Sequence, residues 1–130
     1  MSCLVKICGL KYVATVDTAV EAGADAVGFV FAKSVRQVTA QHAAFIAAHV
    51  PKKVLRVAVM MHPSIEEWDE VQTIFCPDVL QTDMEDFQYL DVPDDIEIWP
   101  VIRQGNAPSS EDLPNTFVYE GLKSGQGEIV

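Results

Sequence analysis

The sequence predicts an α/β fold, in one domain built from parallel βαβ units. Short runs of apolar and β-branched residues recur along the chain, and the segments between them are helical in periodicity or rich in polar turn residues. These units recur roughly every 25 residues without similarity between their sequences, so the repetition is one of architecture. The chain has 130 residues, 49% of them hydrophobic, which suffices for the core of a single domain at residues 1–130.

The first half of the chain contains three strands and two helices. A strand at residues 4–8 leads into a helix near 13–22, which Gly23 ends, and a second strand follows at 26–31. Thr39 is placed to cap a helix that runs to about residue 50, where Pro51 stops it. A third strand is expected at 55–61.

The second half repeats this alternation. Ser64, after Pro63, begins a helix to about residue 75. We expect its buried side to consist of Ile65, Trp68, Val71 and Ile74. Further strands are expected at 79–82, 96–102 and 116–119, with a weak helix at 86–90 and a Pro- and Ser-rich connection at 106–115.

Six parallel strands fit two architectures. One is an open doubly wound sheet, and the other is an eight-stranded barrel of which this chain carries six units, because a complete barrel needs at least about 200 residues. Both architectures place chemistry at the carboxyl ends of the strands. The residues that follow each strand are therefore the candidates for function.

Composition excludes several classes of function. The formal net charge is −10 and the nine Lys and Arg residues form no basic stripe, so we expect no nucleic-acid partner. The N-terminal segment resembles neither a signal peptide nor a membrane span, which favours a cytoplasmic protein without a membrane partner.

The cysteines and histidines indicate no metal site. Three cysteines without C-x-x-C spacing favour neither a disulfide framework nor a zinc site. His42, His49 and His62 show no ligand spacing with a carboxylate or thiol, and we expect them to be surface residues. We therefore expect no metal.

Several strand-end motifs occur in an order that is typical of one family. The first strand ends in Lys6-Ile7-Cys8-Gly9. The chain also contains, in order, the run Glu21 to Phe31, a loop with Ser34, Arg36 and Val38, the third-strand residues Val57 and Val59 with the Pro63-Ser64 turn, Val79-Leu80-Gln81, Tyr119-Glu120-Gly121, and Gly125 to Gly127. With these motifs the whole chain resembles the phosphoribosylanthranilate isomerases. It differs from the family pattern at Val35, where Pro is usual, and at Glu120, where many members have Asp. After Gln81 many members continue into a His-Gly pair, whereas here Thr82, Asp83 and Met84 follow, with Asp83 in place of the usual strand-four His.

The resemblance implies a (β/α)8 barrel, here partial. It implies an isomerase of tryptophan biosynthesis that converts N-(5-phosphoribosyl)anthranilate, a small phosphosugar, to 1-(o-carboxyphenylamino)-1-deoxyribulose 5-phosphate by an Amadori rearrangement. It further implies that the reaction uses neither a metal nor an organic cofactor. A histidine-pathway isomerase performs the same rearrangement on a larger substrate, but that family generally uses Asp as the base on strand one, so Cys8 disfavours it.

The resemblance also assigns the catalytic roles. Cys8 is expected to be the base, and Lys6 lies on the same face of the strand, where its charge could favour thiolate. Glu120 is expected to be the general acid. Asp83 is the rival carboxyl, or else a helix N-cap.

Two further residues are expected to bind substrate, together with Lys6 and Asp83. Arg36 offers a planar donor fork that suits the anthranilate carboxylate. Gln81 could form a hydrogen bond with substrate from strand four, although a structural role is equally open.

An alternative is that the 130-residue chain is catalytically silent, since the family binds the substrate phosphate on loops of strands seven and eight. A barrel that lacks these strands has unpaired edges at its first and sixth strands. We therefore expect a homo-oligomer that associates through the exposed sheet edges.

Overall fold

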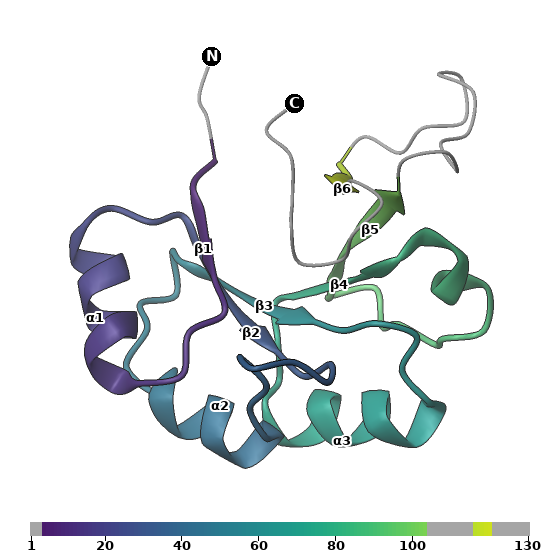
Figure 1. The fold of residues 1–130 in the computed structure, drawn as a ribbon, viewed down its shortest axis with the longest axis horizontal. Coiled ribbons are helices and arrows are strands. Elements are labelled where there is room, and N and C mark those ends of the chain that lie inside the picture. Colours follow the sequence, from purple (N-terminus) through teal and green to yellow (C-terminus); the bar gives the residue numbers. More distant parts are fainter. Residues whose placement is uncertain (1–3, 104–115, 121–130) are drawn as a thin grey trace.

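The computed structural model describes residues 4–103 and 116–120, which form six parallel strands with helices between them (Figure 1). In chain order the elements are β1 (Lys6–Cys8), α1 (Val13–Glu21), β2 (Ala26–Val30), α2 (Ala40–Ile46), β3 (Leu55–Val59), α3 (Ile65–Ile74), β4 (Val79–Asp83), the 3-10 helix η1 (Met84–Gln88), β5 (Glu97–Arg103) and β6 (Val118–Glu120). The connection at 106–115 and the glycines at 121, 125 and 127 lie outside the described residues.

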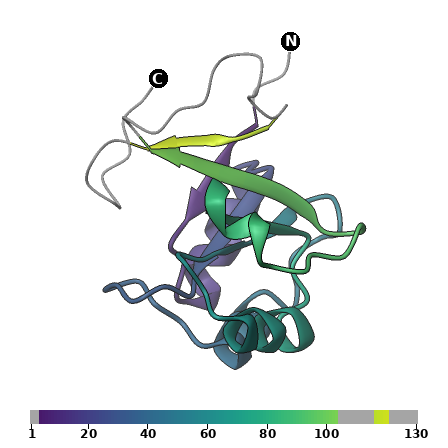
Figure 2. The ribbon, with the colours of Figure 1, turned by 90° about the vertical axis from the view of Figure 1, so that its right-hand side faces the viewer.

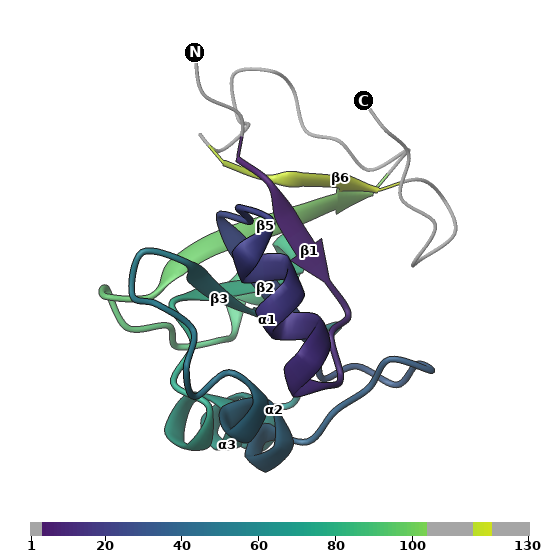
Figure 3. The same ribbon diagram turned by 90° about the vertical axis from the view of Figure 1, so that its left-hand side faces the viewer.

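The order of the strands decides between the two architectures. The sheet runs β1-β2-β3-β4-β5-β6, and each strand pairs in parallel with the next one in sequence. A doubly wound sheet would reverse its order at a switch point. The chain therefore forms a curled, singly wound sheet, as six units of a barrel do. Figure 2 shows the β5–β6 margin of this sheet, and Figure 3 shows the β1 margin.

The two faces of the sheet have different cores. The helices α1, α2 and α3 lie on one side of the sheet (Figure 1). Alternate strand residues such as Phe29 and Leu80 pack there in a cluster that includes Val16 of α1, Ile46 of α2 and Trp68 of α3. The opposite, interior face carries a smaller apolar cluster of strand residues: Ala26, Val57, Val79 and Trp99. Because side chains alternate along a strand, the interior cluster and the functional side chains share one face.

Local signals explain the helix boundaries. Thr39 caps α2 by accepting a hydrogen bond from the backbone N–H of His42, as its position predicted. Ser64 and Glu67 form a reciprocal capping box at the start of α3. Gly23 follows α1 with a φ of 93°, the left-handed conformation that commonly ends a helix.

Two expectations about the helices were wrong. The helix α2 ends at Ile46 and not near residue 50, because the chain continues in tight turns whose N–H groups bond three residues back, from Ala48 to Phe45 and from Val50 to Ala47. In α3, Trp68 and Val71 are buried, but Ile65 and Ile74 are 54% and 37% exposed. Within the described part of the chain, no helix has the length and apolar character needed to cross a bilayer.

Candidate functional site

The carboxyl end of β1 places Cys8 beside two glycines. A Cβ atom at Gly28, the β2 partner of Cys8, would lie 3.1 Å from the Cys8 Sγ atom, so glycine leaves room for the thiol. Gly9 has a φ of 81°, and a Cβ atom there would lie 2.5 Å from Cδ of Arg36. The structure thus brings the Arg36 side chain against the residue that follows Cys8.

Lys6 and Gln81 meet across the interior of the sheet. The Lys6 ammonium donates a hydrogen bond to Oε1 of Gln81 and lies 5.8 Å from the centroid of the Trp99 ring. Gln81 is buried at 4% exposure, and Lys6 is partly buried. A positive charge and an amide are therefore held together on the interior face, and both belong to the set that the sequence predicted.

Asp83, at the end of β4, is paired with an arginine that the sequence reasoning did not select. Nε and a terminal nitrogen of Arg103 donate to the two Asp83 oxygens at 2.9 and 2.8 Å. Asp83 occupies the N-cap position of η1, but its side chain makes no capping hydrogen bond. The Asp83 carboxylate therefore binds Arg103 and does not cap η1.

Glu120 is the last residue of β6, and its backbone pairs with Arg103 of β5. The backbone of Glu120, the expected general acid, therefore lies beside Arg103, the residue that binds Asp83.

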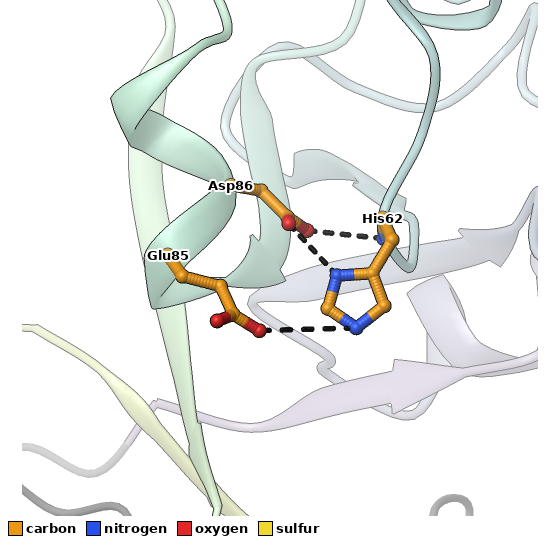
Figure 4. A group of neighbouring side chains, drawn as sticks. All are labelled: His62, Glu85 and Asp86. Carbon is orange, nitrogen blue, oxygen red and sulfur yellow. Dashed lines mark hydrogen bonds and ion pairs between the residues drawn. The ribbon is translucent and has the colours of Figure 1, made fainter.

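His62, in the loop after β3, is the main residue that sequence reasoning missed. It contacts Asp86 through its backbone N–H, at 3.0 Å to Oδ2, and through Nδ1, at 2.8 Å to Oδ1 (Figure 4). Its Nε2 lies 3.4 Å from Asp83 and 4.0 Å from Glu85. His62 is exposed, as expected of a surface residue, but the expectation that it shows no ligand spacing with a carboxylate was wrong. Its position just after a strand was the signal that could have found it.

The surroundings of His62 change its ionisation. The hydrogen bond with Asp86 raises the pKa of the imidazole above its usual value, and the charges of Asp86, Asp83 and Glu85 act in the same direction, while desolvation opposes them. The side chain of His62 is about half exposed, whereas that of Asp86 is 2% exposed. The imidazole can therefore exchange protons with the solvent while a buried carboxylate fixes its orientation.

A cavity of about 680 Å³ opens beside these side chains. Its lining includes His62, Asp83 and Arg103 together with the apolar side chains of Phe87 and Val101. Among the residues that the structure describes, one group of side chains could hold a metal ion, and it consists of His62, Glu85 and Asp86. Their potential ligand atoms all lie within 4.8 Å of one another. The expectation that no metal is used stays a prediction.

Comparisons with known proteins agree on one family. Residues 5–117 match the family model described as N-(5'phosphoribosyl)anthranilate (PRA) isomerase. The N-(5'-phosphoribosyl)anthranilate isomerase of Listeria monocytogenes serotype 4b is 37% identical over 119 residues, which cover 88% of this chain and 58% of that protein. The corresponding enzyme of Listeria welshimeri is 52% identical over 64 residues, 49% of this chain and 32% of the relative.

Solved structures show the same fold. The phosphoribosyl anthranilate isomerase of Thermus thermophilus superposes with a TM-score of 0.78 at 24% identity, over 98% of this chain and 67% of that one. A phosphoribosyl anthranilate isomerase in complex with reduced 1-(o-carboxyphenylamino)-1-deoxyribulose 5-phosphate gives 0.75 at 24% identity, over 92% and 66%. Monomers of the dimeric enzyme of Thermotoga maritima give 0.64 at 26% identity, over 78% and 53%.

The chain spans between about a third and three fifths of the length of the curated relatives described above. The family match, by contrast, covers most of the chain, and the solved relatives share its fold. The chain therefore belongs to the N-(5'-phosphoribosyl)anthranilate isomerase family.

Proposed function

We propose that this chain isomerises N-(5-phosphoribosyl)anthranilate to 1-(o-carboxyphenylamino)-1-deoxyribulose 5-phosphate in tryptophan biosynthesis. The single observation that carries the proposal is the Cys8 thiol at the carboxyl end of β1, with space left for it at Gly28 and the Arg36 side chain against Gly9. This end of a parallel strand is where barrel enzymes hold their chemistry.

In this proposal Cys8 removes the proton from carbon two of the ring-opened substrate. The thiolate is the reactive form of cysteine, and a nearby cation or backbone dipole favours it. Lys6 is the nearest cation on the same strand, and its ammonium contacts Gln81 and the face of Trp99. Lys6 and Gln81, which are joined by a hydrogen bond on the interior face, then bind substrate together.

Glu120 is proposed as the acid that protonates the furanose ring oxygen so that the ring opens. Asp83 is the weaker candidate, because both of its oxygens accept hydrogen bonds from Arg103. We assign Asp83 to substrate binding together with Arg103, and Arg36 to the anthranilate carboxylate, for which a guanidinium fork is suited.

A homo-oligomer and a cytoplasmic location complete the proposal. The free thiols of Cys8 and Cys76 suit a reducing compartment. The sheet of the described residues ends at β1 and β6, each of which has one neighbouring strand. Self-association without catalysis is the alternative function.

Turnover of N-(5-phosphoribosyl)anthranilate by the purified chain, measured as product formation, tests the proposal. We expect Cys8→Ala to lower kcat by about 100-fold or more, because it removes the proton acceptor. Cys76→Ser is the matched control, since Cys76 is an exposed thiol that follows α3.

Growth of a tryptophan auxotroph that carries the chain is a second readout. Full activity of Cys8→Ala would refute the base assignment, and full activity of Glu120→Ala would refute the acid. A chain that supports neither turnover nor growth would favour the silent, self-associating alternative.

A further inference from the structure

His62 is held in an unusual backbone conformation by a single carboxylate. Its φ is 45°, in the left-handed region that non-glycine residues rarely adopt. Both its backbone N–H and its ring bond to Asp86 (Figure 4). Such a conformation persists only where the surroundings over-determine it, and it is concentrated at functional sites.

Asp86 is itself fixed. Its carboxylate is 2% exposed and accepts a third hydrogen bond, at 2.7 Å, from the hydroxyl of Thr82 on β4. With Nδ1–H donated to Asp86, the neutral imidazole presents the lone pair of Nε2. A carboxylate that orients an imidazole in this way prepares the other ring nitrogen to accept a proton.

The charges around the ring strengthen the imidazole as a base. Asp86 and Glu85 of η1 and Asp83 of β4 face it, and Arg103 of β5 lies behind Asp83. Three carboxylates against one guanidinium favour the protonated ring, so Nε2 binds a proton more tightly than a free imidazole does. His62 borders the same cavity as Asp83 and Arg103.

After the ring oxygen has been protonated, the rearrangement still needs two proton removals and one proton donation. After the ring opens, carbon two loses its proton and an enaminol forms. The ketone then forms when the hydroxyl on carbon two loses its proton while carbon one gains one. In the proposed function Cys8 serves the first removal. The hydroxyl proton can go to the Glu120 carboxylate that ring opening leaves behind, or to a second base beside the cavity.

We propose that His62 is a second proton-accepting residue of this site, oriented by Asp86, and that it takes the proton of the hydroxyl on substrate carbon two. The inference rests on the proposed function. The O–H bond breaks and its electrons form the carbonyl, while the electrons of the carbon–carbon double bond take up a proton at carbon one from the Cys8 thiol. The imidazolium then releases its proton to solvent through its exposed side, and Glu120, which gave its proton to the ring oxygen, regains one from solvent, so the isomerisation consumes no net proton.

The test compares the pH dependence of kcat for the wild-type chain, His62→Asn, Asp86→Asn and the control His49→Asn. Asn is chosen at position 62 because it tolerates a positive φ. We expect His62→Asn to lower kcat by about 100-fold or more with little change in KM. Asp86→Asn should move the acidic limb of the kcat profile to lower pH, because it removes the main cause of the raised pKa of His62. His49, an exposed residue after α2, should leave the profile unchanged.

Imidazole NMR titration of the same proteins gives a readout that does not depend on turnover. We expect the pKa of His62 to lie above the usual value for an imidazole, and Asp86→Asn to lower it. If Asp86→Asn leaves the pKa of His62 unchanged, orientation by Asp86 is overturned. Full kcat in His62→Asn, or an acidic limb that Asp86→Asn does not move, overturns this inference while the proposed function stands. Absence of turnover in the wild-type chain overturns the proposed function and this inference with it.

Discussion

At the end of β1, Gly9 combines a φ of 81° with close contact to the Arg36 side chain. Gly9→Ala adds a left-handed backbone penalty of about 1–2 kcal/mol and a clash with Arg36. Gly23→Ala is the matched control, because Gly23 has a φ of 93° but no atom within 4 Å of an added Cβ. We expect urea unfolding to show a larger loss for Gly9→Ala than for Gly23→Ala. Equal losses would show that the exposed Arg36 side chain moves aside without a measurable cost.

His62 gives a residue-scale prediction for the pH dependence of stability. Its pKa is raised in the folded chain, mainly by the Asp86 hydrogen bond, so the fold favours the protonated ring. The resulting stabilisation is fully present below the unfolded pKa of about 6.5 and is lost as the pH rises through the folded pKa. The free energy of unfolding of the wild type minus that of His62→Asn should therefore fall between pH 5.5 and 8.5, values chosen on either side of about 6.5. A difference that stays constant over this range would contradict the assignment.

At the scale of single elements, α3 depends on its capping box. Ser64 accepts from the Glu67 N–H at 3.1 Å, and Glu67 accepts from the Ser64 N–H at 3.0 Å. Ser64→Ala should lower the free energy of unfolding by about 1 kcal/mol. Glu67→Gln keeps a side-chain acceptor and should cost less. Thermal or urea unfolding measures both, and equal stability of Ser64→Ala and the wild type would show that the cap is dispensable.

The elements also show what local sequence can predict. All six strands and the capped starts of α2 and α3 could be predicted, because alternation, capping residues and glycine act within a few positions. The end of α2 could not be predicted. Pro51 restricts only the backbone of the residues next to it, and the helix had already ended before Ala47.

The candidate site was less predictable than the elements. Cys8, Arg36 and Gln81 could be selected from family motifs. The structure places Cys8 at the end of β1, Arg36 in the loop after β2 and Gln81 in the middle of β4. The pairs His62–Asp86 and Asp83–Arg103 join residues 24 and 20 positions apart, respectively, and only the packing of β3, β4 and β5 brings them together. A sequence pattern that extends over one element carries no information on such contacts.

At the scale of the whole molecule, the proposed self-association would use the margins of the curled sheet. In the described residues, β1 and β6 each pair on one side only, and an unpaired strand edge is a template for another strand. Val5 and Ile7, at the β1 margin, are 49% and 39% exposed. Two copies could cover these edges together, so we expect a mass that rises with concentration in analytical ultracentrifugation.

A charged substitution on an edge strand distinguishes association through strand pairing from non-specific association of apolar surfaces. Ile7→Lys should lower the association, because lysine on an edge strand opposes strand pairing. Phe45→Lys is the matched control, since Phe45 is an apolar side chain on α2 that is 71% exposed but far from either edge in the strand order. If the two variants weaken association equally, the contact is a general apolar one. A monomer mass that does not depend on concentration would show that the edges are protected within a single copy.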